Sequence, residues 1–445
     1  MIAREVHRPK ARAVWAVLDQ TLSSASNFAL AVIVARRVGT TEYGVFAIGF
    51  TIYALALGVS RALSTDPLVV RFSHKSLADQ HKEARTAAGT AVLFGVLLGG
   101  LLVAAAFLAG SPLRSSLLAF GLGMPFLLWQ DSYRYQFVAS RRPQLAALND
   151  LVWLLALTAL FTIAVQADAS TAAPFVAAWS AAAGCAALVG MAFARTWPRG
   201  RGAVHWLRLH ADLNVRFAVE FIMISGAPQL VLLALAAVSG YSEAGGLRGA
   251  IVLLGPVILL ATGAVIATVP EGVRLKDRNP ARLRRVVCLV AAALSVVVIV
   301  WSAAVSQLPD RAGEALLGPT WHLAQEITFP LGLAVAGTAA SAGLAAGLRS
   351  LAAAGRSLRA TTPAVLLLVA GGIAGGVLGG GVGAARGMVI PAWIGVALYL
   401  RQFLHALRDA DSNRLPPDEA GRRGDGYLRA PQERFGSRFQ RAREH

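Results

Sequence analysis

The sequence predicts an all-α integral membrane protein with about twelve transmembrane helices, arranged as two six-helix lobes. Three observations support this fold class. The 445-residue chain is 56% hydrophobic and only 15% charged, whereas soluble domains average about 25% charged residues. Its apolar residues form long segments, and the connections between these segments are alternately rich and poor in Lys and Arg. A short motif also recurs at nearly half the chain length.

A transmembrane helix needs about 20 mostly apolar residues. By this rule the candidate segments lie at about 14–36, 43–64, 86–110, 116–139, 145–167, 171–195, 214–239, 245–270, 285–307, 322–348, 361–384 and 387–404. The glycine-rich run LLLVAGGIAGGVLGGGVGAARG leaves the boundary between the last two segments open.

The positive charges predict the topology, because cytoplasmic connections carry an excess of Lys and Arg. With the N-terminus placed in the cytoplasm, 34 of the 42 Lys and Arg residues fall on the cytoplasmic side and 6 on the other side. This bias predicts a multi-pass protein of the cell membrane with both termini in the cytoplasm. The formal net charge of +18 is therefore mainly a topology signal, and nucleic acid is not expected as a partner.

The motif VGTTEYGVF, residues 38–46, resembles SGYSEAGGL, residues 239–247, at an offset of 201 residues. Each copy follows an odd-numbered segment, so the offset predicts two parallel six-helix halves; the alternative is a glycine turn that recurs by chance. We expect an N-terminal lobe at 1–196, a basic cytoplasmic linker at 197–213, a C-terminal lobe at 214–404 and a disordered cytoplasmic tail at 405–445.

Polar residues interrupt the first apolar segment. Asp19, Ser23 and Asn27 share one helical face at about 100° per residue, and Gln20 lies beside it. A charge at the bilayer centre costs at least about 2.5 kcal/mol, so this face is expected to line a hydrated cavity. The alternatives are that Asp19 lies at the membrane interface, or that these polar groups only join helices.

Three arginines and one further acid are the other candidate functional residues. Arg61 lies near the cytoplasmic end of the second segment, where its side chain could also reach the membrane surface. Arg248 lies just inside the outer end of the eighth segment. Arg134 is three residues after Asp131, so this spacing predicts an ion pair between them. Glu220 belongs to the seventh segment.

The sequence contains no signature that predicts an enzyme. P-loop, H-E-x-x-H, G-x-S-x-G and Asp-rich metal motifs are all missing from it. Cys185 and Cys288 lie in apolar segments and are expected to be small buried hydrophobic residues. We therefore expect a non-enzymatic protein without a cofactor or a metal, and transport that does not use an ATP-binding module of this chain.

The run LDQTLSSASNFALAVIVARRVGTTEYGVFAIGFTIYALALGVSRAL closely resembles the opening helices of polysaccharide and teichoic acid export flippases. These flippases belong to the multidrug/oligosaccharidyl-lipid/polysaccharide exporter superfamily. The matching residues are Asp19, Gln20, Ser23, Asn27, Phe28, Ala35, Arg36, Gly39, Glu42, Gly44 and Arg61. ASRRPQLAALNDLVW and GGLRGAIVLLGP are also similar to that family.

The resemblance implies two six-helix lobes around a central cavity. It also implies a transporter that flips undecaprenyl-diphosphate-linked sugars between leaflets by alternating access, with polysaccharide assembly proteins as further expected partners. Arginines in its cavity would bind the diphosphate, because the guanidinium fork matches phosphate oxygens. Arg61 and Arg248 are the first candidates, followed by Arg134 and Asn27. Asp19 and Glu220 are candidates for coupling to protons or sodium.

Other functions stay open at this stage. A multidrug exporter of the same superfamily would expel organic cations and would favour unpaired acids and aromatic residues in the cavity. A membrane enzyme of cell-wall polysaccharide assembly and a non-transporting scaffold for sugar polymerisation are the remaining alternatives.

Overall fold

The computed structural model describes residues 9–73 and 75–412, and no strand occurs in this part of the chain. Its helices are α2 (Pro9–Arg37), α3 (Thr40–Leu63), α4 (Thr65–Phe72), α5 (Leu77–Leu108), α6 (Leu113–Ala139), α7 (Pro143–Gln166), α8 (Ala172–Ala194), α9 (Ala203–Leu209), α10 (Ala211–Phe221), η1 (Ile222–Gly226), α11 (Ala227–Ser239), α12 (Tyr241–Arg278), α13 (Pro280–Ser306), α14 (Asp310–Leu317), η2 (Gly318–Thr320), α15 (Trp321–Ser350) and α16 (Ala354–Ser412). The predicted all-α class is confirmed.

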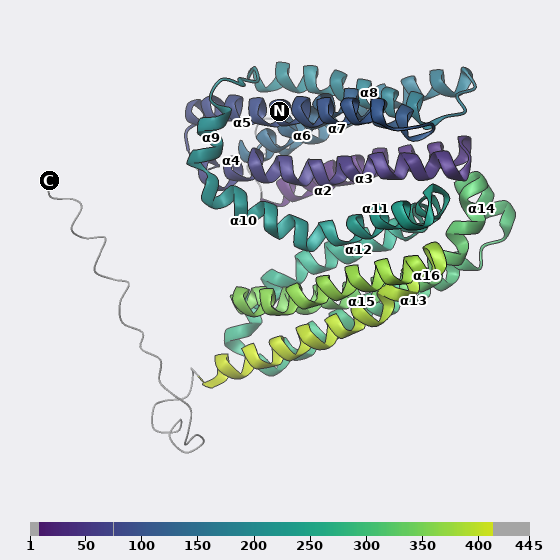
Figure 1. Ribbon diagram of the computed structural model, residues 1–445. Helices are drawn as coiled ribbons and strands as arrows, with labels where there is room; N and C mark the ends of the chain where they lie inside the picture. Colours follow the sequence, from purple (N-terminus) through teal and green to yellow (C-terminus); the bar gives the residue numbers. More distant parts are fainter. Residues whose placement is uncertain (1–8, 74, 413–445) are drawn as a thin grey trace.

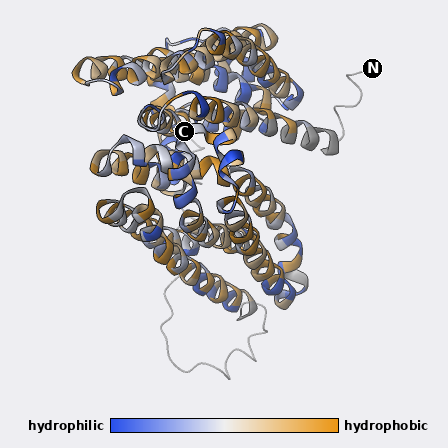
Figure 2. Cartoon of the chain, turned by 90° about the vertical axis from the view of Figure 1, so that its right-hand side faces the viewer, coloured by the Kyte–Doolittle hydropathy of each residue, from blue (hydrophilic) through white to orange (hydrophobic). Residues whose placement is uncertain are grey.

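Eight of the described helices are long and apolar enough to cross a membrane. Large apolar side chains lie on their surfaces: Leu108 is 92% exposed and Leu378 is 87% exposed, and Figure 2 shows hydrophobic residues along the outside of the helices. Exposed apolar surface of this extent requires lipid rather than water. The chain is therefore a multi-pass membrane protein. The expectation that Cys185 is buried is wrong, because a membrane helix can turn apolar residues toward lipid.

The last long helix, α16, contains a sharp turn. A straight α-helix of its 59 residues would measure about 88 Å, far more than the hydrocarbon thickness of about 30 Å. The backbone leaves helical geometry at Gly379 and Gly380, where φ of Gly380 is +59°. A Cβ atom on Gly371 would lie 2.3 Å from the carbonyl oxygen of Gly387, so only glycine allows the two arms to pack this closely. The boundary expected near 384–387 therefore lies at 379–380.

Three of the expected spans, at 14–36, 116–139 and 214–239, correspond to α2, to α6 and to the chain from α10 to α11. In the described part, these helices do not meet the same length and apolarity criterion. The seventh expected span is interrupted by the π-helical turn η1, and Pro228 follows at the start of α11. Proline lacks the N–H that would continue the backbone ladder. The exact number of twelve spans stays a prediction.

The helices form two groups that meet along α3 and α12. In Figure 1, α2 to α8 lie in the upper part of the molecule and α11 to α16 in the lower part. The helix α9, within the expected linker, lies at one end of the bundle, which we name the linker face. The α2–α3 turn, the α11–α12 turn and α14 lie at the other end, which we name the distal face.

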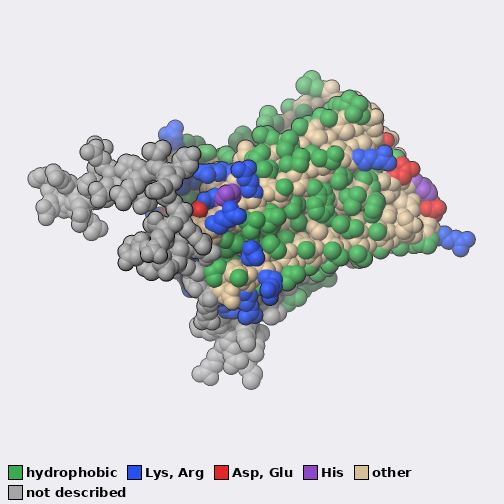
Figure 3. All heavy atoms as spheres, turned by 90° about the horizontal axis from the view of Figure 1, so that it is seen from below, with side chains coloured by type: hydrophobic (Ala, Val, Ile, Leu, Met, Phe, Trp, Pro, Cys, Tyr) green, Lys and Arg blue, Asp and Glu red, His purple; other side chains and the backbone are tan. Residues whose placement is uncertain are grey.

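The charged side chains are distributed unevenly between these ends. Figure 3 shows Lys and Arg gathered mainly toward one end of the molecule, with an apolar belt in the middle and most of the visible Asp, Glu and His at the other end. This is the distribution that the positive-inside rule describes. Which face is cytoplasmic stays a prediction, as do the lobe boundaries.

Candidate functional site

A polar cavity of about 190 Å³ lies inside the first group of helices. Its lining residues are Gln20, Ser23, Ser24 and Asn27 of α2, Tyr53, Leu57 and Arg61 of α3, Gln130, Asp131 and Arg134 of α6, and Trp153 of α7. The fold thus brings together three of the residues proposed for substrate binding, Asn27, Arg61 and Arg134, although they lie far apart in sequence.

The polar face of α2 points into the protein, as its helical spacing predicts. Ser23 and Ser26 are 8% and 1% exposed, whereas Ala25 and Phe28 on other faces are exposed. Arg134 of α6 donates hydrogen bonds to the Ser23 hydroxyl and to the Gln20 side-chain oxygen, each at 3.2 Å. These bonds tie α2 to α6 across the cavity.

Arg61 and Asp131 form a two-point ion pair. Arg61 donates from Nε to Oδ2 of Asp131 at 2.8 Å and from Nη2 to Oδ1 at 2.6 Å. The guanidinium also lies 4.8 Å from the ring centroid of Tyr135. The expected pairing of Asp131 with Arg134 is therefore replaced by a bond between α3 and α6, because the bidentate geometry satisfies both carboxylate oxygens of Asp131.

Arg134 pairs with an acid that the sequence analysis did not single out. Its Nε lies 3.4 Å from Oδ2 of Asp150 on α7, and both side chains are at most 9% exposed. Gln130 donates to Oδ1 of Asp150 at 2.8 Å and to Oδ1 of Asn149 at 3.0 Å. The motif NDLVW contains Asp150, and its position in an apolar segment was the signal that could have identified it.

Aromatic rings hold the helices around this cavity. The ring of the fully buried Trp179 on α8 lies 4.8 Å from Tyr53, 5.9 Å from Phe50 and 5.9 Å from Trp153, between ring centroids. Offset and edge-to-face contacts of this kind stabilise by about 0.5–1.5 kcal/mol each beyond area burial. The first group of helices is therefore a well-packed unit, and its polar cavity is enclosed by closely packed aromatic side chains.

Arg248 occupies a different environment, at the contact between α3 and α12. It is 9% exposed, and its guanidinium carbon lies 4.1 Å from the ring centroid of Phe50. Its Nε is buried and has no hydrogen-bond acceptor among the described residues, and no described carboxylate lies within ion-pair distance of it. Among the described residues, Arg248 is a buried cation that faces an aromatic ring and no carboxylate.

The two copies of the repeated motif contact each other just beyond Arg248, toward the distal face. A Cβ atom on Gly44 would lie 1.7 Å from the carbonyl oxygen of Tyr241, and one on Gly245 would lie 2.8 Å from that of Thr40. Residues 44 and 245 are equivalent in the repeat, as are 40 and 241, so the contact is reciprocal. The hydroxyls of Thr41 and Ser242 are 3.0 Å apart. The two groups of helices are therefore closed against each other at the distal face.

The glutamates of the repeat also have equivalent roles. Glu42 accepts a hydrogen bond from the N–H of Ala172, the first residue of α8, at 3.4 Å. Glu243 accepts one from the N–H of Gly381, at the start of the second arm of α16, at 2.6 Å. Carboxylates favour the positive ends of helices. Each copy of the motif thus holds the start of a later helix in its own half.

Of the two proposed coupling residues, only the side chain of Glu220 is described. Glu220 is exposed on α10 and does not line the cavity. Asp19 belongs to α2, but its side chain falls outside the described residues. Among the residues that are described, no group of three or more His, Cys, Asp or Glu side chains could hold a metal ion.

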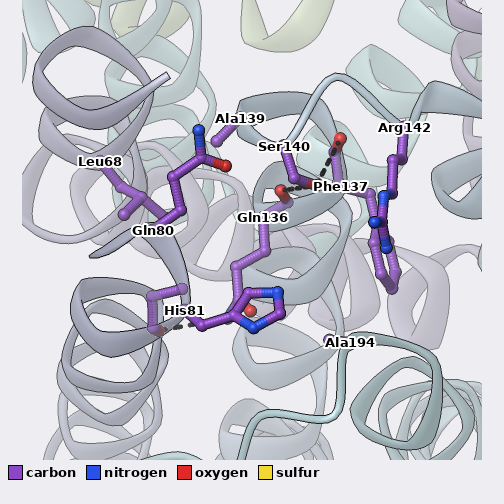
Figure 4. A pocket seen from close by; sticks show the side chains of 10 residues that line it. Leu68, Gln80, His81, Gln136, Phe137, Ala139, Ser140, Arg142 and Ala194 are labelled. Atoms are coloured by element: carbon purple, nitrogen blue, oxygen red, sulfur yellow. Dashed lines mark hydrogen bonds between the residues drawn. The ribbon is translucent and has the colours of Figure 1, made fainter. Parts of the chain in front are cut away.

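A second pocket lies at the linker face, where α4, α5 and α6 meet (Figure 4). His81, Gln136 and Arg142 line it. Its volume is about 20 Å³, which is enough for about one water molecule. This pocket is too small for a transported solute.

No protein-family profile and no curated protein sequence matches this chain. Among solved structures, an inward-facing multidrug resistance MATE family transporter of the MOP superfamily matches with a TM-score of 0.71 and 11% identity over 90% of this chain and 100% of that one. The lipid II flippase MurJ, in an inward closed conformation, matches with a TM-score of 0.65 and 10% identity over 89% of this chain and 90% of that one. A MOP superfamily transporter from Pyrococcus furiosus, described as having a binding pocket of reverse polarity, matches with a TM-score of 0.54 and 13% identity over 91% of this chain and 96% of that one. The chain therefore has the fold of MOP superfamily transporters.

Proposed function

We propose that this chain is a flippase that moves a lipid-diphosphate-linked oligosaccharide across the cytoplasmic membrane by alternating access, for export of a cell-surface polysaccharide. Its fold is shared with membrane transporters that include a lipid II flippase. The sequence resemblance of the first 70 residues to polysaccharide export flippases supports the same class. The partners we infer are the lipid bilayer, an undecaprenyl-diphosphate-linked sugar and polysaccharide assembly proteins.

Arg248 is the observation on which this proposal rests. A buried guanidinium without a counter-ion is destabilising unless a ligand supplies the missing charge. An anionic substrate entering between the two groups of helices would meet Arg248 below the closed distal contact. A diphosphate offers paired oxygens that match the guanidinium fork. Arg248 is therefore the proposed first contact of the substrate diphosphate.

Arg61, Arg134 and Asn27 have a secondary role in this proposal. Both arginines already pair with carboxylates, Asp131 and Asp150. A substrate diphosphate would have to replace a carboxylate to reach them, which links substrate binding to rearrangement of the cavity. Asp19 and Glu220 are the proposed coupling groups for protons or sodium.

The alternative function is a multidrug exporter. The similarity to an inward-facing MATE transporter, at a TM-score of 0.71, favours this alternative. An organic cation, however, needs an acid whose charge is free to bind it. Asp131, which lines the cavity, and Asp150, which contacts the cavity residues Arg134 and Gln130, are both paired with arginines. Among the described residues at the contact of the two halves, the buried charge without a counter-ion is that of Arg248, and its positive sign favours an anionic substrate.

A deletion strain complemented with Arg248 variants tests the function. We expect lipid-linked oligosaccharide to accumulate in the inner leaflet of the deletion strain. Arg248→Ala should leave that accumulation unrelieved at normal membrane abundance, and Arg248→Lys should relieve it in part, since Lys keeps the charge and loses the fork. Arg114→Ala, which removes an exposed cation, is the matched control and should complement fully.

Two results would contradict the proposal. Normal lipid-linked sugars in the deletion strain, together with increased sensitivity to organic cations, would identify a multidrug exporter. Full complementation by Arg248→Ala would contradict the proposed contact of Arg248 with the substrate diphosphate, and with it the observation on which the proposed function rests.

A further inference from the structure

A groove of about 480 Å³ lies between α2 and α7, separate from the polar cavity. No residue lines both spaces. On α2 the groove is lined by Ala29, Ile33 and the two arginines Arg36 and Arg37. These residues recur every three or four positions and therefore form one helical stripe.

The facing stripe on α7 has the same character. Leu154, Thr158 and Thr162 follow one another at intervals of four residues, and Gln166 ends the stripe. Both helices end at the distal face, so the polar ends of the two stripes coincide at Arg37 and Gln166. The groove is apolar inside and cationic at its mouth.

The two threonines do not make the interior polar. Thr158 donates its hydroxyl to the carbonyl of Leu154 at 2.8 Å, and Thr162 donates to that of Thr158 at 2.9 Å. Their hydrogen atoms are thus used within α7, and little remains in the groove to recognise a sugar or another polar ligand. Below its mouth the groove is suited to a hydrocarbon chain.

The length of the groove matches one leaflet of a bilayer. At 1.5 Å per residue, the stripe from residue 29 to 37 spans about 12 Å and that from 154 to 166 spans about 18 Å. Half of the hydrocarbon thickness is about 15 Å. A lipid that lies with its headgroup at the distal face would therefore place one chain along the groove.

The mouth determines the charge of this lipid. Arg36 and Arg37 are both exposed, and no described carboxylate lies within ion-pair distance of either. A basic residue near a membrane surface attracts anionic headgroups. Two adjacent guanidinium groups can bind the oxygens of one phosphate.

We propose that the groove between α2 and α7 is a binding site for an anionic phospholipid of the leaflet at the distal face. The lipid phosphate binds Arg36 and Arg37, and one acyl chain lies along Ile33, Leu154 and Thr158. Because the bound lipid contacts both helices, it stabilises the packing of α2 on α7. The same helix α2 also lines the polar cavity. The site is independent of which solute the protein transports.

Native mass spectrometry of the full chain, released from nanodiscs that contain phosphatidylglycerol and phosphatidylcholine, tests the proposal. We expect selective retention of phosphatidylglycerol. The double variant Arg36→Ala/Arg37→Ala should reduce that retention roughly tenfold or more, and the double Lys variant should keep most of it. Ile33→Trp, which fills the groove, should also reduce retention with the arginines intact.

Two matched controls define the site. Arg114→Ala removes another exposed arginine at the distal face, and Val96→Trp adds a ring to a membrane-exposed position on α5; both should retain the lipid. Equal retention of phosphatidylglycerol and phosphatidylcholine, or unchanged retention in the Arg36→Ala/Arg37→Ala variant, would overturn the proposal. A third result would also overturn it: the groove shows no selectivity for phosphatidylglycerol, and undecaprenyl phosphate alone displaces the bound lipid. That result would assign the groove to a polyprenyl lipid.

Discussion

At the scale of single residues, the embedded charges fall into two kinds. Arg61 and Arg134 are each held by a carboxylate on a neighbouring helix, so their charges are compensated inside the protein. Arg248 lies against Phe50 with no carboxylate partner in the described part of the chain. The first kind joins helices, and the second can recruit an anion. The same residue type therefore has different roles, which depend on what surrounds it.

The Arg61–Asp131 pair gives a prediction for stability. Asp131→Asn removes the charge partner of a largely buried guanidinium, which should reduce the free energy of unfolding by about 1–3 kcal/mol. The exchanged double variant Arg61→Asp/Asp131→Arg should recover a large part of this loss. Thermal unfolding in detergent measures both, with Glu220→Gln at an exposed acid as the control. An unchanged unfolding temperature in Asp131→Asn would show that the pair does not stabilise the fold.

At the scale of helices, the contact between α3 and α12 depends on glycine. Gly44 and Gly245 let the two backbones approach at the distal face, and close approach through small residues is a common way for membrane helices to associate. Transporters of this fold are solved in inward-facing and outward-facing forms, with TM-scores to this chain of 0.71 and 0.55. This structure superimposes better on the inward-facing transporter than on the outward-facing one.

A methyl group at Gly44 should open this contact, because its Cβ would lie 1.7 Å from the Tyr241 carbonyl oxygen. The contact can be measured as disulfide formation between Thr41→Cys and Ser242→Cys, whose hydroxyls are 3.0 Å apart. We expect Gly44→Ala to slow that cross-link severalfold. Gly39→Ala is the matched control, since a Cβ there would have no heavy atom within 4 Å, and it should leave the rate unchanged. Equal rates in the two variants would mean that α3 and α12 tolerate a wider separation.

Another contact between elements fixes the linker to the first group of helices. Arg71 of α4 donates to the Leu209 carbonyl oxygen at 3.1 Å, to Nδ1 of His210 at 2.7 Å and to both carboxylate oxygens of Asp212. The ring of Trp206 on α9 lies 4.2 Å from that of His210. Because Arg71 is a donor, Nδ1 of His210 must be unprotonated. This contact joins α4, α9 and α10 at the linker face.

Acid should weaken the linker contact. Burial, and then the neighbouring Arg71, hold the pKa of His210 below its ordinary value, while Asp212 opposes them and His205 adds to them. The unfolded linker therefore binds a proton more readily than the folded one, so stability is full above about pH 6.5 and falls as the pH drops below that value. Hydrogen-exchange protection of residues 203–214, taken relative to the intrinsic exchange rate at each pH, should decrease from pH 7.5 to 5.5.

Two variants separate the roles of the histidines in that experiment. His210→Asn should remove most of the pH dependence of the exchange protection, because Asn does not titrate. His205→Gln, at an exposed position, should retain it. The same pH dependence in His210→Asn as in the unchanged chain would exclude His210 as the titrating group.

At the scale of the whole molecule, the charge bias gives a testable topology. Gly110 and Ser170 are exposed in turns at the distal face, and Gly200 and Gly355 are exposed at the linker face. In a chain without its native cysteines, single Cys substitutions at Gly110 and Ser170 should react with an impermeant thiol reagent on intact cells. Those at Gly200 and Gly355 should react only after permeabilisation. Labelling of Gly200→Cys on intact cells would reverse the predicted orientation.

The sequence by itself determined the all-α class, the apolar segments and the polar face of α2. These follow from local composition and from the period of 3.6 residues per turn, which any helix obeys. The repeat was also visible in sequence, as two short motifs 201 residues apart. The charge bias needed only the order of apolar segments and connections.

Only the tertiary structure decided which residues meet. Arg61 pairs with Asp131 across 70 residues, and Arg134 pairs with Asp150 on the next helix, whereas spacing alone suggested the local pair Asp131 and Arg134. Likewise, the two motif copies were visible, but their mutual contact through Gly44 and Gly245 was not. Helical periodicity places a side chain on one face of its own helix. The neighbour of that face is set by the packing of all the helices together, a property that no local window of the sequence contains.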